Sequence, residues 1–159
     1  SISPSMDIQV ASNFERILFY LCEENSENLA KLMYDLKIKG HFKLTGKQLK
    51  HLKDYFSASS CSEDETIKII KNIYSKFNYL IDPHTATGIK PLLDSKYKQD
   101  SCFCFETAHP SKFPAAILKA INIKPKFPKN FKTIDNKYED FSILDNKIDR
   151  VKEFILEKI

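Results

Sequence analysis

Reactive side-chain types gather in the stretch FETAHPSKFP, Phe105–Pro114, which follows the apolar run CFCF. Thr107, His109 and Lys112 place a hydroxyl, an imidazole and an amine within six positions. Two interpretations of these residues remain open. The first is a structural turn in which a strand ends and Thr107 or His109 caps a helix that begins at Pro110. The second is a cofactor site, because open α/β sheets bind ligands at the carboxyl ends of their strands.

The stretch IDPHTATG, Ile81–Gly88, is the second candidate for chemistry. Pro83 suits a first helical turn and disfavours helical angles in the preceding residue, so Asp82 is the expected cap of a helix. His84 and Thr85 then lie at the helix start, where free backbone amide groups favour anions. From these residues alone, His84 can either face a ligand or pack in the core of a capped helix.

Helical spacing of apolar residues predicts most of the elements that would position these side chains. The pair Ser62 and Glu65 matches a capping box at the start of one helix. The predicted helices begin at Ser12 or Asn13 and carry Phe14 to Leu21, run from Ser26 to Gly40 and from about Gly46 to Asp54, follow Ser62 through Phe77, follow Asp82 to about Asp94, run from Pro110 to Ile121, and extend from Ile143 to Ile155.

The clearest predicted strand is SCFCFET, Ser101–Thr107, which is apolar on both faces. Such a strand belongs in a parallel sheet that is covered on both sides. The chain offers only one or two partners, among them the short β-like segment YFSASSC, Tyr55–Cys61. The expected fold class is therefore helix-rich α/β, with one or two strands of a larger sheet whose other strands lie upstream of Ser1.

Composition argues against several classes of partner. The net charge is only +4, and Arg16 and Arg150 are the only arginines among 25 basic residues, so a nucleic-acid interface is not expected. No apolar run approaches the roughly 18 residues of a membrane span, and the amino end does not resemble a signal peptide. The histidines and cysteines lack metal-binding spacing, which predicts free thiols in a reducing cytoplasm and no metal.

Three stretches resemble one family when they are taken together: SPSMDIQVASNFER (Ser3–Arg16), DPHTATG (Asp82–Gly88) and TAHPSKFP (Thr107–Pro114). Their order and content resemble the carboxy-terminal part of threonine synthase, a pyridoxal-phosphate lyase of the tryptophan-synthase-β-like fold type II. The resemblance implies that residues 1–122 form the carboxy-terminal part of the catalytic domain. Residues 123–159 would be a loop and a carboxy-terminal helix.

The resemblance also implies a reaction and a cofactor. The family converts O-phosphohomoserine and water to threonine and phosphate, and pyridoxal 5'-phosphate stabilises the carbanions that this requires. Thr107 stands where a hydroxyl is expected to meet the pyridine nitrogen, and His84, Thr85 and His109 are implied to lie near the cofactor. Glu106 departs from the small residue that is common in the family, although strand alternation would point its side chain away from that of Thr107.

Asp7, Asn13 and Arg16 are implied to shape the substrate entrance, although Arg16 is equally suited to a structural salt bridge. Lys112 is expected to be a surface or phosphate-steering residue, because the first helical turn after a proline is usually exposed.

Two parts of such an enzyme are not found in this sequence. They are the Schiff-base lysine and the Ser-Gly-Asn type loop that cradles the cofactor phosphate, since Gly40, Gly46 and Gly88 are not clustered. We therefore expect no turnover by these residues alone, and the expected partner is the amino-terminal portion of threonine synthase. The alternatives are an inactive remnant or a helix-rich interaction module. An uncovered CFCF segment also predicts self-association.

Overall fold

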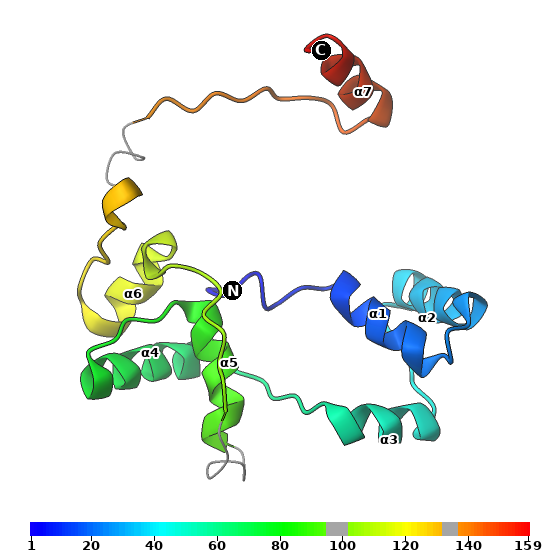
Figure 1. Cartoon of the computed structure of the whole chain (residues 1–159), viewed down its shortest axis with the longest axis horizontal. Coiled ribbons are helices and arrows are strands. Elements are labelled where there is room, and N and C mark those ends of the chain that lie inside the picture. The colour runs from blue at the N-terminus through cyan, green and yellow to red at the C-terminus, as the bar shows by residue number, and fades with distance from the viewer. Residues whose placement is uncertain (95–101, 132–136) are drawn as a thin grey trace. The chain divides into compact units, whose positions relative to one another are not determined.

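The computed structural model describes residues 1–94, 102–131 and 137–159 (Figure 1). They fall into two units, Ser1–Pro125 and Lys126–Ile159. The first unit contains α1 (Ser12–Leu21), α2 (Ser26–Lys39), α3 (Gly46–Tyr55), α4 (Glu63–Phe77), α5 (Pro83–Asp94), the 3₁₀ turn η1 (Pro110–Lys112) and α6 (Pro114–Ile121). The second unit contains the 3₁₀ turn η2 (Lys129–Phe131) and α7 (Ile148–Leu156).

Local signals set most of the helix ends. The Ser62 hydroxyl accepts from the amide of Glu65, and the Glu65 side chain accepts from the backbone of Ser62, which confirms the predicted capping box of α4. Gly40 ends α2 with φ 74°, and Asn78 ends α4 with φ 51°, both in the left-handed region that closes helices. The start of α1 differs from the prediction: Ala11 is its N-cap, without a side-chain hydrogen bond.

Two predicted helices have different bounds. The helix expected from Pro110 is divided into η1 and α6 at Phe113, which has φ −129° and ψ 54°. The cause is Pro114, because a proline ring disfavours helical angles in the residue before it. The last helix begins at Ile148 and not at Ile143, since Lys147 before it is extended, with φ −133° and ψ 130°.

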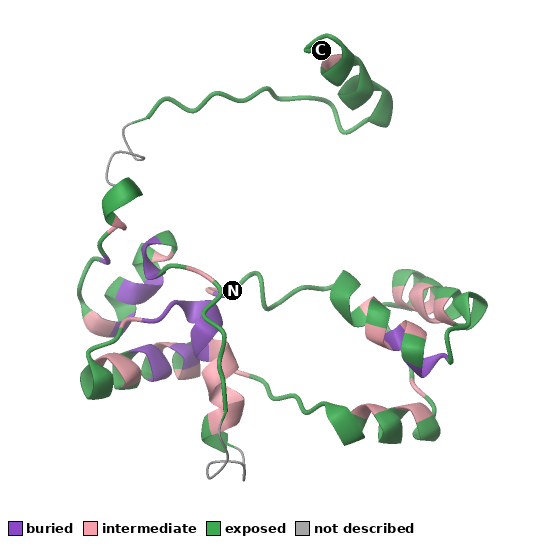
Figure 2. Cartoon of the chain, viewed as in Figure 1, coloured by how far each residue is buried: buried purple, intermediate pink, exposed green. Residues whose placement is uncertain are grey.

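The core of the first unit lies where α4, α5 and α6 pack together. Its buried members are Ile69, Ile70, Ile81, Ala86, Ile117 and Ala120. Ile70 and Ile117 have no exposed surface, and the buried residues of this group stand out in purple in Figure 2. Separately, α1 packs against α2 and α3 and buries Leu18, Leu21 and Cys22. The core between α4, α5 and α6 therefore holds in place the turn that carries His84 and Thr85.

The predicted strand at Ser101–Thr107 is not formed in the part of the chain that the structure describes. Residues 102–107 have no regular secondary structure, and Phe103 and Phe105 are 88% and 84% exposed. The segment Tyr55–Cys61 forms no strand either. The physical reason is that a strand is held by a neighbouring strand, and the described residues offer none. The apolar exposure expected for CFCF is confirmed.

The second unit has little interior of its own. Along α7, the apolar residues Ile148, Val151 and Ile155 are exposed, and Phe154 is half-buried. Within the described ranges, no helix is both long and apolar enough to cross a membrane. The same residues contain no cluster of histidine, cysteine and acidic side chains that could hold a metal ion.

Candidate functional site

The turn that begins α5 is built around the carboxylate of Asp82, which has no exposed surface. One carboxylate oxygen accepts from the backbone amide of His84 at 2.9 Å and from its ring nitrogen Nδ1 at 2.8 Å. The other accepts from the backbone amide of Thr85 at 3.1 Å and from its hydroxyl. Asp82 is thus the cap that the sequence predicts, and it also orients both following side chains.

His84 is buried, and its ring connects two other stretches of the chain. The backbone amide of Ser5 donates to Nε2 at 3.2 Å, so Nδ1 carries the ring proton that Asp82 accepts. The ring also lies against the ring of Phe113, with centroids 4.6 Å apart. Only 4% of His84 is exposed, which leaves its ring no free nitrogen for a ligand.

Thr85 is buried as well, and its carbonyl meets the CFCF segment. The Cys104 thiol donates to the carbonyl oxygen of Thr85 at 3.8 Å. One turn further along α5, a Cβ added at Gly88 would lie 3.1 Å from the Cys104 sulfur. Partial burial raises the pKa of the Cys104 thiol, with a smaller contribution from the negative charge of Asp82. A glycine at position 88 therefore lets this segment approach the helix closely.

Thr107 and His109 lie on the surface, between this contact and η1. The Thr107 side chain is exposed and has no hydrogen-bond partner among the described residues. His109 accepts at Nδ1 from the amide of Ser111 at 3.2 Å and lies 2.7 Å from its hydroxyl oxygen. This arrangement leaves Nε2 of His109 as an N–H donor directed away from its own turn. Lys112 is exposed in η1, as expected.

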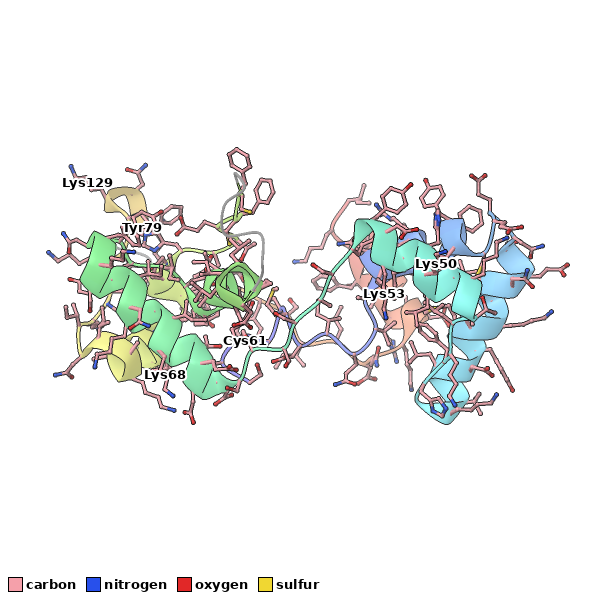
Figure 3. The ribbon with its side chains drawn as sticks, turned by 90° about the horizontal axis from the view of Figure 1, so that it is seen from below. Lys50, Lys53, Cys61, Lys68, Tyr79 and Lys129 are labelled. Carbon is pink, nitrogen blue, oxygen red and sulfur yellow. The ribbon has the colours of Figure 1, made fainter. Side chains whose placement is uncertain are left out.

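Glu106 is bound by a residue that sequence reasoning did not single out. Tyr79 lies in the connection between α4 and α5 and is labelled in Figure 3. Its hydroxyl donates to the Glu106 carboxylate at 2.5 Å. This hydrogen bond and the negative charge raise the pKa of Tyr79. The carboxylate next to Thr107 is therefore engaged with a phenol.

The three residues predicted for the substrate entrance lie in exposed positions. Asp7 accepts a hydrogen bond from the Ser1 hydroxyl, and Asn13 and Arg16 lie on α1. Arg16 borders a surface hollow of about 450 Å³ together with Glu15 and Phe19. No ion pair of Arg16 is present in the described part of the chain, so the structural salt bridge considered from sequence is not formed there.

The predicted residues form one connected group and several separate positions. His84 and Thr85 are joined through Asp82, and His84 reaches the stretch that contains Asp7 through the amide of Ser5. Within the described ranges, no hydrogen bond or ion pair joins Thr107 to Asn13 or Arg16. Asp82 was expected only as a cap, and Ser5 was not expected at all, because its contribution is a backbone amide that no side-chain pattern reveals.

Comparison with known proteins assigns the family. A family model for the carboxy-terminal region of threonine synthase matches residues 85–155. Threonine synthase of Pseudomonas aeruginosa is 32% identical over 157 residues, which are 98% of this chain and 34% of that protein. Threonine synthase of Schizosaccharomyces pombe is 39% identical over 134 residues, which are 76% of this chain and 26% of that protein.

Solved structures agree with these matches. The crystal structure of pyridoxal-phosphate-bound threonine synthase from Brucella melitensis superposes with a TM-score of 0.80 at 34% sequence identity. The matched region comprises 99% of this chain and 34% of the Brucella chain. Threonine synthase from yeast gives a TM-score of 0.78 at 27% identity. The chain thus spans about a third of the length of the Pseudomonas and Brucella proteins. It belongs to the threonine synthase family and corresponds to the carboxy-terminal portion of that family's proteins.

Proposed function

We propose that this chain forms the carboxy-terminal part of a threonine synthase active site. Completed by the family's amino-terminal portion, the protein converts O-phosphohomoserine and water to threonine and phosphate. The observation that carries the proposal is the hydroxyl of Thr107, exposed and without a hydrogen-bond partner among the described residues. It lies inside the region that the threonine synthase family model matches.

Pyridoxal 5'-phosphate fits the residues that the chain offers, but only in part. The cofactor needs an amine for its aldehyde, a cradle for its phosphate and a partner for its pyridine nitrogen. Thr107 suits the third need, since its hydroxyl is free in the described part of the chain. Gly40 ends a helix, while Gly46 and Gly88 lie within helices, so none belongs to a phosphate-binding loop. The phosphate cradle is therefore assigned to the amino-terminal portion, and the family resemblance implies the same for the amine.

In this arrangement the cofactor, when bound, supplies the electron sink for carbanion chemistry. The Thr107 hydroxyl meets the pyridine nitrogen and, being neutral, does not hold a proton on it as a carboxylate would. The outward N–H of His109 Nε2 is placed to donate to a phosphate or carboxylate oxygen near the cofactor. His84 and Thr85, being buried, contribute by shaping the wall of the site and not by direct contact.

Asp7, Asn13 and Arg16 are proposed to line the substrate entrance. The exposed guanidinium of Arg16, which has no ion pair in the described ranges, suits the phosphate group of O-phosphohomoserine, because arginine binds phosphate with two parallel hydrogen bonds. Asp7 and Asn13 offer a carboxylate and an amide for the substrate's ammonium and carboxylate groups.

The proposed partner is the family's amino-terminal portion, and the uncovered segment 102–107 is where it would dock. Phe103 and Phe105 expose most of their surface, and in the described part of the chain neither of these two residues makes a backbone–backbone hydrogen bond. A strand from the amino-terminal portion would pair with this backbone and cover the two rings.

A chimera tests the proposal. Residues 1–159 would replace the carboxy-terminal third of the Brucella melitensis enzyme, the structural relative with a TM-score of 0.80. We expect phosphate release from O-phosphohomoserine in the presence of the cofactor. Thr107→Val should lower kcat about tenfold, because it removes one hydrogen bond to the pyridine nitrogen without changing the size of the side chain.

Thr87→Val is the matched control. Its hydroxyl donates to the carbonyl of His84 at 2.7 Å within α5, so the change should leave kcat within about twofold. A chimera that folds and binds the cofactor but releases no phosphate would overturn the proposal. Equal kcat for Thr107→Val and the unchanged chimera would remove the role assigned to Thr107.

A further inference from the structure

The three stretches that carry the family resemblance meet at one side chain, His84. Its own stretch supplies Asp82, the first stretch supplies the amide of Ser5, and the third supplies the ring of Phe113. Ser5 is 79 positions away from His84 in the sequence. Among the described residues, no other hydrogen bond or ion pair joins the first stretch to α5.

We propose that His84 is a positioning residue of the active site. With its proton on Nδ1, it holds the segment Ser3–Asp7 and the start of α6 in fixed places relative to the start of α5. It touches neither cofactor nor substrate, and acts through the side chains that these segments carry. As a statement about catalysis, this inference rests on the proposed function.

The hydrogen bonds determine the ring's orientation and its protonated nitrogen. Asp82 has no exposed surface, and its carboxylate can only accept, so Nδ1 of His84 must be the donor. Nε2 then has a lone pair directed at the amide of Ser5, 3.2 Å away. Both partners are directional, whereas a merely packed ring would tolerate any apolar side chain of equal size. The contact with Phe113 adds burial on the remaining side.

The residues next to these contacts are the ones proposed to meet ligands. Asp7 lies two positions after Ser5, and its own amide donates to the carbonyl of Ser3 at 3.3 Å, so this short segment forms one turn. His109 lies four positions before Phe113, and its imidazole is joined to Ser111 in the same turn. His84 therefore sets the place of a substrate-side carboxylate and of a cofactor-side imidazole through the same ring.

Two substitutions separate positioning from packing. His84→Asn keeps an amide N–H that can donate to Asp82, but its shorter side chain leaves no acceptor at the position of Nε2, to which Ser5 donates. His84→Phe keeps the ring and its contact with Phe113, but it has neither nitrogen. The readout is the rate of hydrogen exchange at the Ser5 backbone amide, measured by NMR on the 159-residue chain. His109→Asn is the matched control, because His109 is an exposed histidine that does not contact Ser5.

We expect exchange at Ser5 to accelerate at least about tenfold in both His84 variants, with exchange at Ile70 unchanged and the control unaffected at Ser5. Unchanged exchange at Ser5 in His84→Phe overturns the inference. Should the variants fail to fold, nitrogen NMR of the unsubstituted chain decides. A protonated Nδ1 and a bare Nε2 on His84 support the inference, and a protonated Nε2 overturns it.

The chimera gives the catalytic readout. We expect His84→Asn to lower kcat/KM about tenfold and to raise KM more than it lowers kcat, since the entrance segment is loosened while Thr107 stays in place. Unchanged kcat/KM in His84→Asn, at accelerated Ser5 exchange, would overturn the positioning role in catalysis. An inactive chimera with His84 intact would instead overturn the proposed function and leave the exchange result standing.

Discussion

The turn at Asp82 that begins α5 and the segment 102–107 before η1 differ in two ways. They differ in how far their polar groups are hydrogen-bonded and in how far their apolar side chains are buried within this chain. At the turn, the buried carboxylate of Asp82 accepts from two backbone amides and two side chains. In the segment 102–107, Phe103 and Phe105 expose most of their surface, and Thr107 lacks a hydrogen-bond partner in the described part of the chain. The turn lies within one stretch that carries the family resemblance, and the segment ends at Thr107, the first residue of another.

This chain therefore pairs the polar groups at the turn by itself, but it leaves the apolar side chains of the segment uncovered. Backbone and carboxylate groups that are removed from water must be paired for a domain to be stable, and at Asp82 they are. Large apolar rings that stay in water offer binding energy to a partner. We therefore expect changes at the turn to alter folding, and changes in the segment to alter association.

The largest expected effect is at the turn. Asp82→Ala should lower the free energy of unfolding by about 3 kcal/mol, because it leaves the amides of His84 and Thr85 and the Nδ1 proton of His84 without an acceptor in the interior. Chemical denaturation followed by circular dichroism measures the change. Asp64→Ala, in the exposed first turn of α4, is the control and should cost less than about 1 kcal/mol. Similar losses of unfolding free energy for the two variants would contradict the stabilising role of the Asp82 hydrogen bonds.

The next effect is expected in the segment and on association. Replacing Phe103 and Phe105 together by serine should weaken self-association of the chain by about tenfold in Kd, because two exposed rings no longer leave water at a contact. The free energy of unfolding should stay within about 0.5 kcal/mol, since neither ring is buried. Sedimentation measures the association. Phe77→Ser, at a side chain that is 60% exposed, is the control, and an equal effect there would contradict the assignment of the surface.

These two regions also differ in how well sequence reasoning anticipates them. The helices and caps follow from local patterns: Ser62 with Glu65, Gly40, and Asp82 before Pro83 all function as predicted. A hydrogen bond between the His84 ring and the amide of Ser5 has no local signature, because it depends on how distant segments pack.

The segment 102–107 shows the opposite limit. Alternation of cysteine and phenylalanine indicates a strand, but a strand also needs a neighbour, and the described residues contain none. The sequence pattern thus located the uncovered segment correctly and predicted its apolar exposure, while its secondary structure was wrong for this chain. Residue type and position made Thr107 a candidate, and the family resemblance, not periodicity, favoured its role at the cofactor.

A smaller effect tests how firmly the segment is held against α5. Gly88→Ala should stabilise the isolated chain by about 0.5 kcal/mol, because alanine is the better helix former. The added Cβ would lie 3.1 Å from the Cys104 sulfur, and the irregular, exposed segment around Cys104 can shift to relieve this contact. In the chimera, where a partner fixes the segment, the same change should cost stability. Thermal unfolding of both proteins, with Cys104→Ala as a second site, measures this. Destabilisation of the isolated chain would show that the segment is already fixed.

The smallest expected effect concerns the link between Tyr79 and Glu106. Their hydrogen bond raises the pKa of Tyr79, so the folded state favours the protonated phenol. Stability from this bond is present below the ordinary tyrosine pKa of about 10, and it is lost as the pH rises through the higher folded pKa. Glu106→Gln should therefore lower the midpoint of tyrosinate formation at Tyr79, measured as the ultraviolet difference between chains with and without Tyr79→Phe.

Tyr138, which is 93% exposed, provides the control for this titration. Its contribution, obtained in the same way with Tyr138→Phe, should not respond to Glu106→Gln. An unchanged midpoint at Tyr79 in Glu106→Gln would mean that the carboxylate next to Thr107 is free in solution. For residues 103–107, the hydrogen bond from the Cys104 thiol to the carbonyl of Thr85 would then remain as the contact with α5, and the place of Thr107 would depend more strongly on the partner that covers it.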